Sequence, residues 1–453
     1  MLCFFSISVR MISVAVFKHH QPTTITVADP DNEEKTEQVE LQSTEPVLKR
    51  GDIVDRNGVL LATSLMTESV FANPKEIKTP EDDADKISKA LDLDEKRLLA
   101  QLKSGKSFIW IKRNLTPKEQ QAVNSLGIPG LYFLPEEKRV YPYGNMFSHV
   151  VGYVGVDNKG LEGIEKQFDT RLRDEALNQQ PFALSLDVRL QGLMHEEVQK
   201  AVTEFQAIGA VGIIMDMHTG ELLSMVSLPD FDPQKPGAAS EDARFNRASL
   251  GAYEMGSTFK SFTMAAALDN NLANMQSKFD ATHPLKIANF TITDSHPENK
   301  WLTVPEIYAY SSNIGAARMG LEIGAKRQKA FLDKLGMLKP VDIELPEKAY
   351  PLYPSDWKEI NTVTISYGHG ISVSPLHLVR GIAAIADGGT LPRLTVLKDG
   401  NKAHPEIHAQ VFRQIPSCSD RGQSHIRGNP PPAGWRGYNR PRQKFRQYKH
   451  RHL

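Results

Sequence analysis

The chain has 453 residues, of which 40% are hydrophobic and 24% charged, an ordinary globular composition with material for about three domains. The only two cysteines, Cys3 and Cys418, lie at opposite ends, so the sequence offers no disulfide framework or metal-binding cysteine cluster, and we expect no metal or cofactor. The formal net charge is zero, but residues 411–453 carry ten Lys and Arg against one acid, which leaves a net charge of −9 on the rest. The acidic body and the basic tail therefore need separate explanations.

The N-terminal apolar run LCFFSISVRMISVAVF covers about sixteen residues and is interrupted by Arg10. A bilayer-spanning helix needs about 20 apolar residues, and the run also lacks the basic start and cleavage site of a secretory signal. Residues 1–20 are therefore either a buried or frayed helix or, as the resemblance below favours, the remnant of a membrane anchor. Residues 21–48 are polar and acid-rich, which is typical of a linker.

Residues 49–175 predict a mixed α+β module. Within RGDIVDRNGVLLATSL at 50–65, the pair Asn57-Gly58 predicts a two-residue hairpin turn between apolar runs. Acidic helices alternate with short apolar patches over 81–126, and strand and turn signals return over 127–156.

Residues 178–400 predict an α+β unit in which helices pack against an antiparallel sheet. A strand in ALSLDV precedes a helix over 189–206, and two strands flank the turn His218-Thr219-Gly220. Helices are also expected over the ranges 256–270, 305–321 and 326–336. TVTISYGHGISVSPLHLVRGIAAIADGG then predicts a buried strand, a Gly-rich turn and an Ala-rich helix.

Two Ser-x-x-Lys patterns occur, and their contexts differ. Ser257 follows a glycine and leads into TFKSFTMAAALD, which predicts a helix, whereas Ser355 lies in the Tyr/Pro-rich segment YPLYPSDWK. On a helix, residues three apart share a face, so Lys260 Nζ can reach Ser257 Oγ and act as its base if its pKa is lowered. The alternative is a helix-capping serine with a surface lysine.

A second polar motif, Ser311-Ser312-Asn313 in YAYSSNIGAARMG, lies about fifty residues later, ahead of another small-residue helix. A Ser-x-Asn places a hydroxyl and an amide on the same side of a short loop. The hydroxyl of Ser311 can relay a proton, and the amide of Asn313 can hold the lysine or a substrate carbonyl. Taken alone, the motif also fits an ordinary polar helix start.

Together the motifs resemble the penicillin-recognising serine transferases, whose motif set is Ser-x-x-Lys, Ser-x-Asn and Lys-Thr-Gly. The chain looks like a class B penicillin-binding protein over residues 48–395, in family order, and most resembles the transpeptidases of the division septum. The segments that carry this resemblance are RGDIVDRNGVLLA, RVYPYGNMFSHVVGYVG, GLEGIEKQFD, SLDVRLQ, MDMHTGELLSMVSLPDFDP, RFNRASLGAYEMGSTFK and ISYGHGISVSPLHLVRGIAAIADGG.

The resemblance implies a penicillin-binding transpeptidase fold over 178–400, preceded by a dimerisation or pedestal module over 49–175. It implies that Ser257 is acylated by a D-Ala-D-Ala stem peptide and by β-lactams, with Lys260 as base and with Ser311 and Asn313 passing the proton and holding the acyl chain. The partners would be peptidoglycan stem peptides, lipid-linked precursors and other division proteins. The chain would reside in a bacterial inner membrane, with its catalytic domain in the periplasm.

The sequence departs from the family pattern in two places. Met255 stands where many relatives have proline, a change that gives up a fixed φ without touching the nucleophile. More seriously, no Lys-[Ser/Thr]-Gly follows Asn313; the only such triplet, Lys103-Ser104-Gly105, precedes Ser257 and reads as a surface turn. In the family, the strand that carries this motif binds the substrate carboxylate and donates one N–H to the oxyanion hole. Removal of one such donor typically lowers the rate by about 10²–10³. Absence of the strand would also leave an unpaired sheet edge.

The segment 405–453 is aperiodic, basic and rich in proline, which predicts disorder. We expect a change of reading frame near 405–412 and missing C-terminal strands; translation of the other frames would test this. A nucleic-acid-binding arm is the rival interpretation of the tail, but we expect no nucleic-acid partner. For the whole chain, the alternatives to a transpeptidase are a D,D-carboxypeptidase or β-lactamase of the same fold, and a catalytically dead division scaffold.

Overall fold

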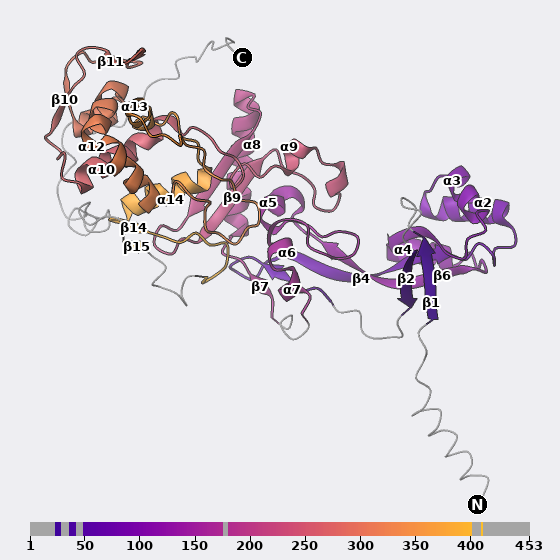
Figure 1. The fold of residues 1–453 in the computed structure, drawn as a ribbon. Coiled ribbons are helices and arrows are strands. Elements are labelled where there is room, and N and C mark those ends of the chain that lie inside the picture. Colours follow the sequence, from indigo (N-terminus) through magenta and orange to yellow (C-terminus); the bar gives the residue numbers. More distant parts are fainter. Residues whose placement is uncertain (1–22, 29–35, 42–48, 175–179, 401–408, 411–453) are drawn as a thin grey trace, which may run out of the picture.

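The computed structural model describes residues 23–28, 36–41, 49–174, 180–400 and 409–410 (Figure 1). The N-terminal apolar run, the basic tail and most of the segment 405–412 lie outside the described residues. Where we predicted a linker, the strands β1 (Thr23–Ala28) and β2 (Thr36–Leu41) form an antiparallel pair. Among the described helices, none is both long and apolar enough to cross a bilayer.

The N-terminal module is built on one long strand, β4 (Leu60–Ala72). Antiparallel β6 (Leu131–Val140) pairs with nearly all of β4, whereas β5 (Ile109–Leu115) pairs only with its second half. Helices α2 (Pro80–Leu91), α3 (Glu95–Leu102) and α4 (Pro117–Asn124) cover this end of the sheet. Val70, Ile87, Leu98 and Ile109 belong to their shared core, so the predicted alternation of helices and strands is confirmed.

The first half of β4 belongs to the boundary with the second unit. It pairs with β3 (Ile53–Val54) across the turn that holds Gly58, whose φ of +86° suits glycine. The predicted hairpin is present, but its turn is longer than the predicted two-residue turn, because Asp55 N–H donates to Val59 O and Gly58 N–H donates to Asp55 O. β3 in turn pairs in parallel with β7 (Phe182–Ala183). Short helical elements surround this boundary: η1 (Gly144–Phe147), α5 (Ser148–Val151), α6 (Gly163–Gln167) and α7 (Asp169–Leu172).

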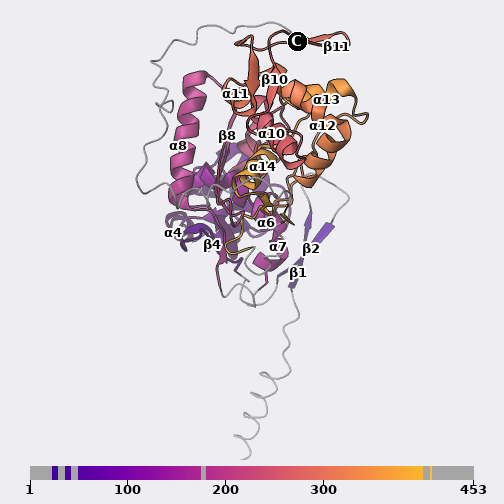
Figure 2. The same ribbon diagram turned by 90° about the vertical axis from the view of Figure 1, so that its left-hand side faces the viewer.

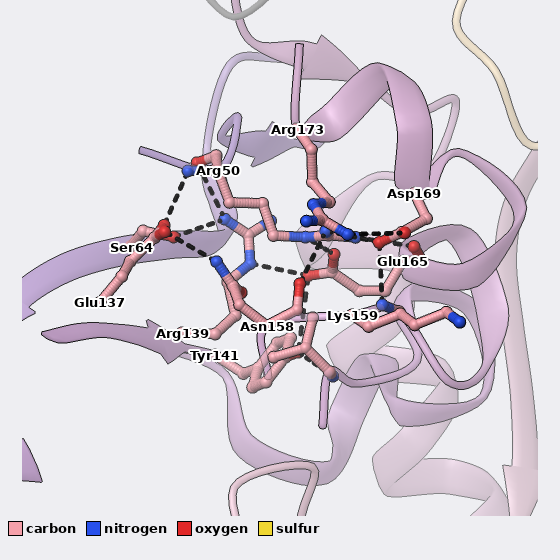
Figure 3. Close-up of polar contacts among 12 residues, drawn as sticks. Arg50, Ser64, Glu137, Arg139, Tyr141, Asn158, Lys159, Glu165, Asp169 and Arg173 are labelled. Carbon is pink, nitrogen blue, oxygen red and sulfur yellow. Dashed lines mark hydrogen bonds and ion pairs between the residues drawn. The ribbon is translucent and has the colours of Figure 1, made fainter. Parts of the chain in front are cut away.

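A buried ionic network lies in the part of the N-terminal module that borders the second unit (Figure 3). Arg50 Nε donates to Glu165 Oε2 at 2.6 Å, and Arg50 Nη1 donates to Asp169 Oδ1 at 2.7 Å. Arg139 Nε donates to the second oxygen of Glu165 at 2.7 Å. The side chains of Arg50 and Glu165 are fully buried. The segments RGDIVDRNG, RVYPYG and GLEGIEKQFD, which have no catalytic role in the motif set, therefore meet in one ion-pair cluster, the junction network.

The second unit contains a two-stranded antiparallel sheet, β8 (Ala210–Met215) with β9 (Leu222–Leu228), in the predicted places. The predicted long helix, α8 (Val188–Phe205), packs on this sheet and stands at the side of the molecule in Figure 2. Within the described residues no strand pairs with the other edge of β8, and Gln191 is the one buried residue of α8. The predicted sandwich is therefore present with a small sheet and an open edge.

The helical half of this unit has a well-buried core and carries the predicted motifs. Its elements are η2 (Pro236–Ala238), α9 (Glu241–Arg244), η3 (Gly256–Phe259), α10 (Lys260–Asp269), β10 (Lys278–Asp280), β11 (Leu285–Ile287), β12 (Phe290–Ile292), β13 (Trp301–Thr303), α11 (Val304–Ala309), α12 (Asn313–Lys334), α13 (Glu359–Ile365), α14 (Pro375–Ala386), β14 (Thr390–Leu391) and β15 (Ala409–Gln410). Phe259, Phe262, Ile307 and Met319 belong to its core.

Two predictions for the helical half need correction. The expected helix 305–321 is two helices, because Ser311 lies between α11 and α12 with a φ of +54°. The expected buried strand TVTIS is largely α13, although its β-branched residues favour a strand. Gln328 Nε2 donates to Thr362 O at 2.9 Å, and Thr362, Val363 and Ile365 are buried at helical spacing, so tertiary packing overrides local preference.

Candidate active site

The predicted nucleophile and base lie at the start of a helix. The 3₁₀ helix η3 carries Ser257 and runs directly into α10, which begins at Lys260. Ser257 is exposed, whereas Lys260 is only 1% exposed, and Lys260 Nζ lies 3.0 Å from Ser257 Oγ. The second Ser-x-x-Lys differs in this respect, because Lys358 is exposed and its Nζ pairs with Asp356 at 3.3 Å.

Ser311 faces this pair from the loop between α11 and α12. Its hydroxyl lies 2.9 Å from Lys260 Nζ and 3.0 Å from Ser257 Oγ, and its carbonyl oxygen accepts a hydrogen bond from Nζ at 2.6 Å. The left-handed backbone conformation costs a non-glycine residue roughly 1–2 kcal/mol. That conformation lets the carbonyl and the hydroxyl of Ser311 reach the same amino group of Lys260. The hydroxyls of Ser257 and Ser311 and the Nζ atom of Lys260 are thus each within hydrogen-bonding distance of the other two, in a closed triangle.

Asn313 completes the set at the first turn of α12. Its Oδ1 accepts from Lys260 Nζ at 2.8 Å, and its Nδ2 donates to Thr293 O at 3.1 Å. The amide group is thereby oriented from both sides. The structure thus brings together all four predicted site residues, Ser257, Lys260, Ser311 and Asn313; their catalytic roles remain predictions.

Sequence reasoning missed Asp294, the carboxylate that holds the Ser-Ser-Asn loop. Asp294 Oδ1 accepts from the backbone N–H of Asn313 at 2.5 Å and of Ile314 at 2.9 Å, and Ser312 Oγ donates to Oδ2 at 2.7 Å. An acidic group at these N–H groups stabilises a helix start. No local pattern in TITDSHPENK marks this residue, because its partners lie about twenty positions later.

The electrostatic state of Lys260 follows from its surroundings. Four oxygen atoms lie within hydrogen-bonding distance of Nζ, and none of them carries a formal charge. Burial lowers the pKa of Lys260 to about 8, although the nearby charge of Asp294 opposes the shift. An ammonium group has three protons for four oxygens, whereas a neutral amine can donate two and accept one from a serine hydroxyl. The arrangement therefore suits a lysine that accepts the proton of a serine.

A glycine turn fixes the segment ahead of Ser257 from the other side. Gly256 N–H donates to Gly368 O at 3.2 Å, and Thr263 Oγ1 donates to Ser366 O at 2.9 Å. A Cβ on Gly368 would lie 1.9 Å from Gly256 O, so only glycine allows this approach. Met255 lies partly buried against the helical core, as expected of an apolar substitute for proline.

The structure does not bring a Lys-[Ser/Thr]-Gly to this site. Lys103-Ser104-Gly105 lies in an exposed turn after α3, in the N-terminal module, as predicted. The described residues also contain no cluster of three or more His, Cys, Asp or Glu that could hold a metal ion.

Comparisons with known proteins agree with this architecture. The family model described as the penicillin-binding protein transpeptidase domain matches residues 210–417, and that of the penicillin-binding protein dimerisation domain matches residues 47–180.

Three curated relatives illustrate the similarity. The chain is 39% identical over 358 residues to the probable peptidoglycan D,D-transpeptidase FtsI of Caulobacter vibrioides, covering 79% of this chain and 61% of that protein. It is 35% identical over 401 residues to the probable peptidoglycan D,D-transpeptidase PenA of Neisseria gonorrhoeae, covering 81% and 69%. It is 28% identical over 393 residues to the peptidoglycan D,D-transpeptidase FtsI of Escherichia coli K12, covering 79% and 66%. The chain thus spans about two thirds of the length of these relatives.

Proposed function

Because the chain belongs to the class B penicillin-binding proteins, with a dimerisation and a transpeptidase domain, we propose that it forms a serine acyl-enzyme with peptidoglycan stem peptides. Relatives at 39% and 35% identity are named as probable peptidoglycan D,D-transpeptidases, which supports this reaction class. The observation that carries the proposal is the triangle of Ser257, Ser311 and buried Lys260.

The proposed reaction begins with Ser257. Lys260, as a neutral amine, accepts the hydroxyl proton while Oγ attacks the penultimate D-alanine carbonyl of a donor peptide. The proton then passes by way of Lys260 and Ser311 to the departing D-alanine amine. Asn313 keeps Lys260 Nζ oriented and is available to the acyl chain. An amine on a second stem peptide releases the acyl group and forms the cross-link, and a β-lactam acylates the same serine.

Labelling with a fluorescent penicillin tests the proposal directly. We expect the purified chain to become covalently labelled, and we expect Ser257→Ala to abolish the label. Ser355→Ala is the matched control, because Ser355 belongs to the second Ser-x-x-Lys, and it should label like the wild type. An unlabelled wild type, or a label that survives Ser257→Ala, would contradict the proposal.

A catalytically inactive division scaffold is the second candidate. Its supporting observation is the absence of any Lys-[Ser/Thr]-Gly after Asn313 in the sequence, since this motif supplies a carboxylate anchor and an oxyanion donor in the family. A folded wild-type chain that binds division proteins but takes no penicillin label would favour the scaffold. The large N-terminal module argues against a simple β-lactamase.

The cellular setting is part of the same proposal. Because its relatives include the division transpeptidases named FtsI, we propose that the chain acts in cell division, on the periplasmic side of the inner membrane. Its proposed partners are stem peptides, lipid-linked precursors, β-lactams and other division proteins. Fractionation of cells that produce the tagged chain would test the location, and recovery in the cytoplasmic fraction alone would contradict it.

A further inference from the structure

The turn that supports Ser257 also carries a histidine held by a carboxylate. His369 follows Gly368, the residue whose carbonyl accepts from Gly256 N–H. His369 Nδ1 lies 3.0 Å from Glu254 Oε2, and the backbone N–H of Gly370 donates to Glu254 Oε1 at 2.6 Å. One carboxylate thereby fixes both the imidazole and the turn beneath it.

Chain connectivity places this histidine near the nucleophile. Gly256 precedes Ser257 and Gly368 precedes His369, so one step along each chain, about 3.8 Å apiece, separates the Gly256–Gly368 contact from the two side chains. Glu254 lies three residues before Ser257. The backbone of His369 therefore lies close to that of Ser257, and Glu254 ties the exposed imidazole to the segment that leads into the nucleophile.

The hydrogen bond also defines which nitrogen is available. An ionised carboxylate only accepts, so Nδ1 must carry the proton that Glu254 binds. The hydrogen bond from His369 and then that from Gly370 lower the pKa of the Glu254 carboxyl, which favours its ionised form. Nε2 of a neutral ring is then a lone-pair acceptor, and the side chain of His369 is 57% exposed.

The second half of the proposed reaction leaves one proton without an acceptor. The incoming acceptor amine is an ammonium ion near neutral pH and cannot attack before it loses a proton. Lys260 is already needed to return a proton to Ser257 Oγ when the acyl-enzyme ester breaks. A second base is therefore useful at the rim, where the acceptor arrives from solvent.

We propose that His369, oriented by Glu254, is the base that deprotonates the acceptor amine; this inference rests on the proposed function. His369 Nε2 takes one proton from the ammonium group, and the freed lone pair forms the amide C–N bond as the ester C–Oγ bond breaks. A second proton of the amine passes through Lys260 and Ser311 to Ser257 Oγ, and the third stays on the nitrogen of the new amide. The imidazolium then releases its proton to water, so His369 and Ser257 return to their starting states.

Two ionisable groups contact this histidine, and a third, Lys260, belongs to the catalytic set; all three enter any pH dependence. Glu254 binds Nδ1, the Tyr367 ring makes an edge contact with a centroid separation of 5.5 Å, and Lys260 of α10 lies beneath the nucleophile. Burial raises the pKa of Tyr367 and lowers that of Lys260. The quantity to follow against pH is therefore the ratio of aminolysis to hydrolysis, because both reactions start from the same acyl-enzyme.

The test compares aminolysis with hydrolysis. The full chain is given a D-alanyl thioester donor with a D-amino acid as acceptor, and acylation by a β-lactam is measured separately. We expect His369→Gln to lower the aminolysis-to-hydrolysis ratio at least about tenfold near pH 7, with β-lactam acylation within twofold of wild type. The deficit should shrink as the pH rises toward the pKa of the acceptor amine. Glutamine can still donate to Glu254, which preserves the turn.

His218→Gln is the matched control, because His218 is 58% exposed and pairs with Asp387 at 2.9 Å outside the site. It should leave both reactions unchanged. A ratio in His369→Gln equal to wild type, or a parallel loss of β-lactam acylation, would overturn the assignment of His369 alone. If the wild type is not acylated by the β-lactam, the proposed function falls and the assignment of His369 falls with it.

Discussion

The junction network and the candidate active site each bury a cationic side chain, and they accommodate it differently. At the junction, burial by itself lowers the pKa of Arg50, but the carboxylates of Glu165 and Asp169 outweigh it, and the pKa is raised. At the site, Lys260 has only uncharged hydrogen-bond partners, and burial lowers its pKa to about 8. One cation stays permanently charged, and the other can lose its proton near neutral pH.

The difference shows how one chain separates stability from chemistry. Removing one partner of a buried ion pair is strongly destabilising, because the other charge is left buried without compensation. A buried lysine without such partners is poised to act as a base. Substitutions at the two places should therefore affect different measurements.

The largest expected effect is at Lys260. Lys260→Met should slow acylation by a β-lactam by about 10⁴-fold, or about 5.5 kcal/mol of barrier, because Ser257 loses its base. The free energy of unfolding at neutral pH should not fall, since methionine removes a buried ammonium. Stopped-flow labelling and urea unfolding measure the two quantities, and Lys358→Met is the exposed control. A variant that loses activity only by unfolding would break the comparison.

Glu165→Gln should give the largest loss of stability. It removes the carboxylate shared by Arg50 and Arg139, and we expect about 3–5 kcal/mol less free energy of unfolding by urea denaturation. Asp169→Asn is the graded control, because its side chain is 20% exposed and the loss should be smaller. Equal losses for the two variants would show that Glu165 has no special place in the network.

The pH dependence of acylation sharpens the comparison at Lys260. With a pKa of about 8, roughly a tenth of the molecules carry neutral Lys260 at pH 7. The acylation rate should therefore rise about tenfold between pH 7 and pH 9 and then level off. Because the folded state lowers the pKa of Lys260, the unfolded state binds its proton more tightly. The free energy of unfolding should therefore rise as the pH increases from about 8 toward the pKa of lysine in the unfolded chain. A rate that is flat over this range would contradict a titrating base.

Asp294→Asn should have the smallest effect. Loss of the charged cap of α12 should cost about 1 kcal/mol of folding free energy, measured by urea denaturation. Because the charge of Asp294 raises the pKa of Lys260, its removal should move the acylation profile to lower pH. A shift to higher pH would mean that Asp294 acts on Lys260 only through the position of the loop.

The local part of the site was predictable, because Ser257 and Lys260 are three residues apart on one helical turn. Ser311 and Asn313 were identified through family resemblance, and the strained backbone of Ser311 was not foreseen. Asp294 could not be foreseen, because its contacts join the segment between β12 and β13 to a helix start about twenty residues later.

The fold was predictable to a similar degree. Hydrophobic periodicity located α8, β8 and β9, whereas the β-branched run TVTI misled because α13 is stabilised by contacts with α12. The segments that contain Arg50, Arg139 and Glu165 were each recognisable by resemblance. Their meeting in one buried cluster depends on the tertiary fold, which no local pattern encodes.

Strand β4 gives the molecule a mechanical property. Its 13 residues, roughly 43 Å at about 3.3 Å per residue, run unbroken from the α2–α4 end to the hairpin with β3. Two-domain proteins commonly articulate about a flexible linker, but here β4 also reaches the second unit through β3, which pairs with β7. A force applied at the far end of the N-terminal sheet is therefore expected to be transmitted along β4 to the base of the catalytic unit.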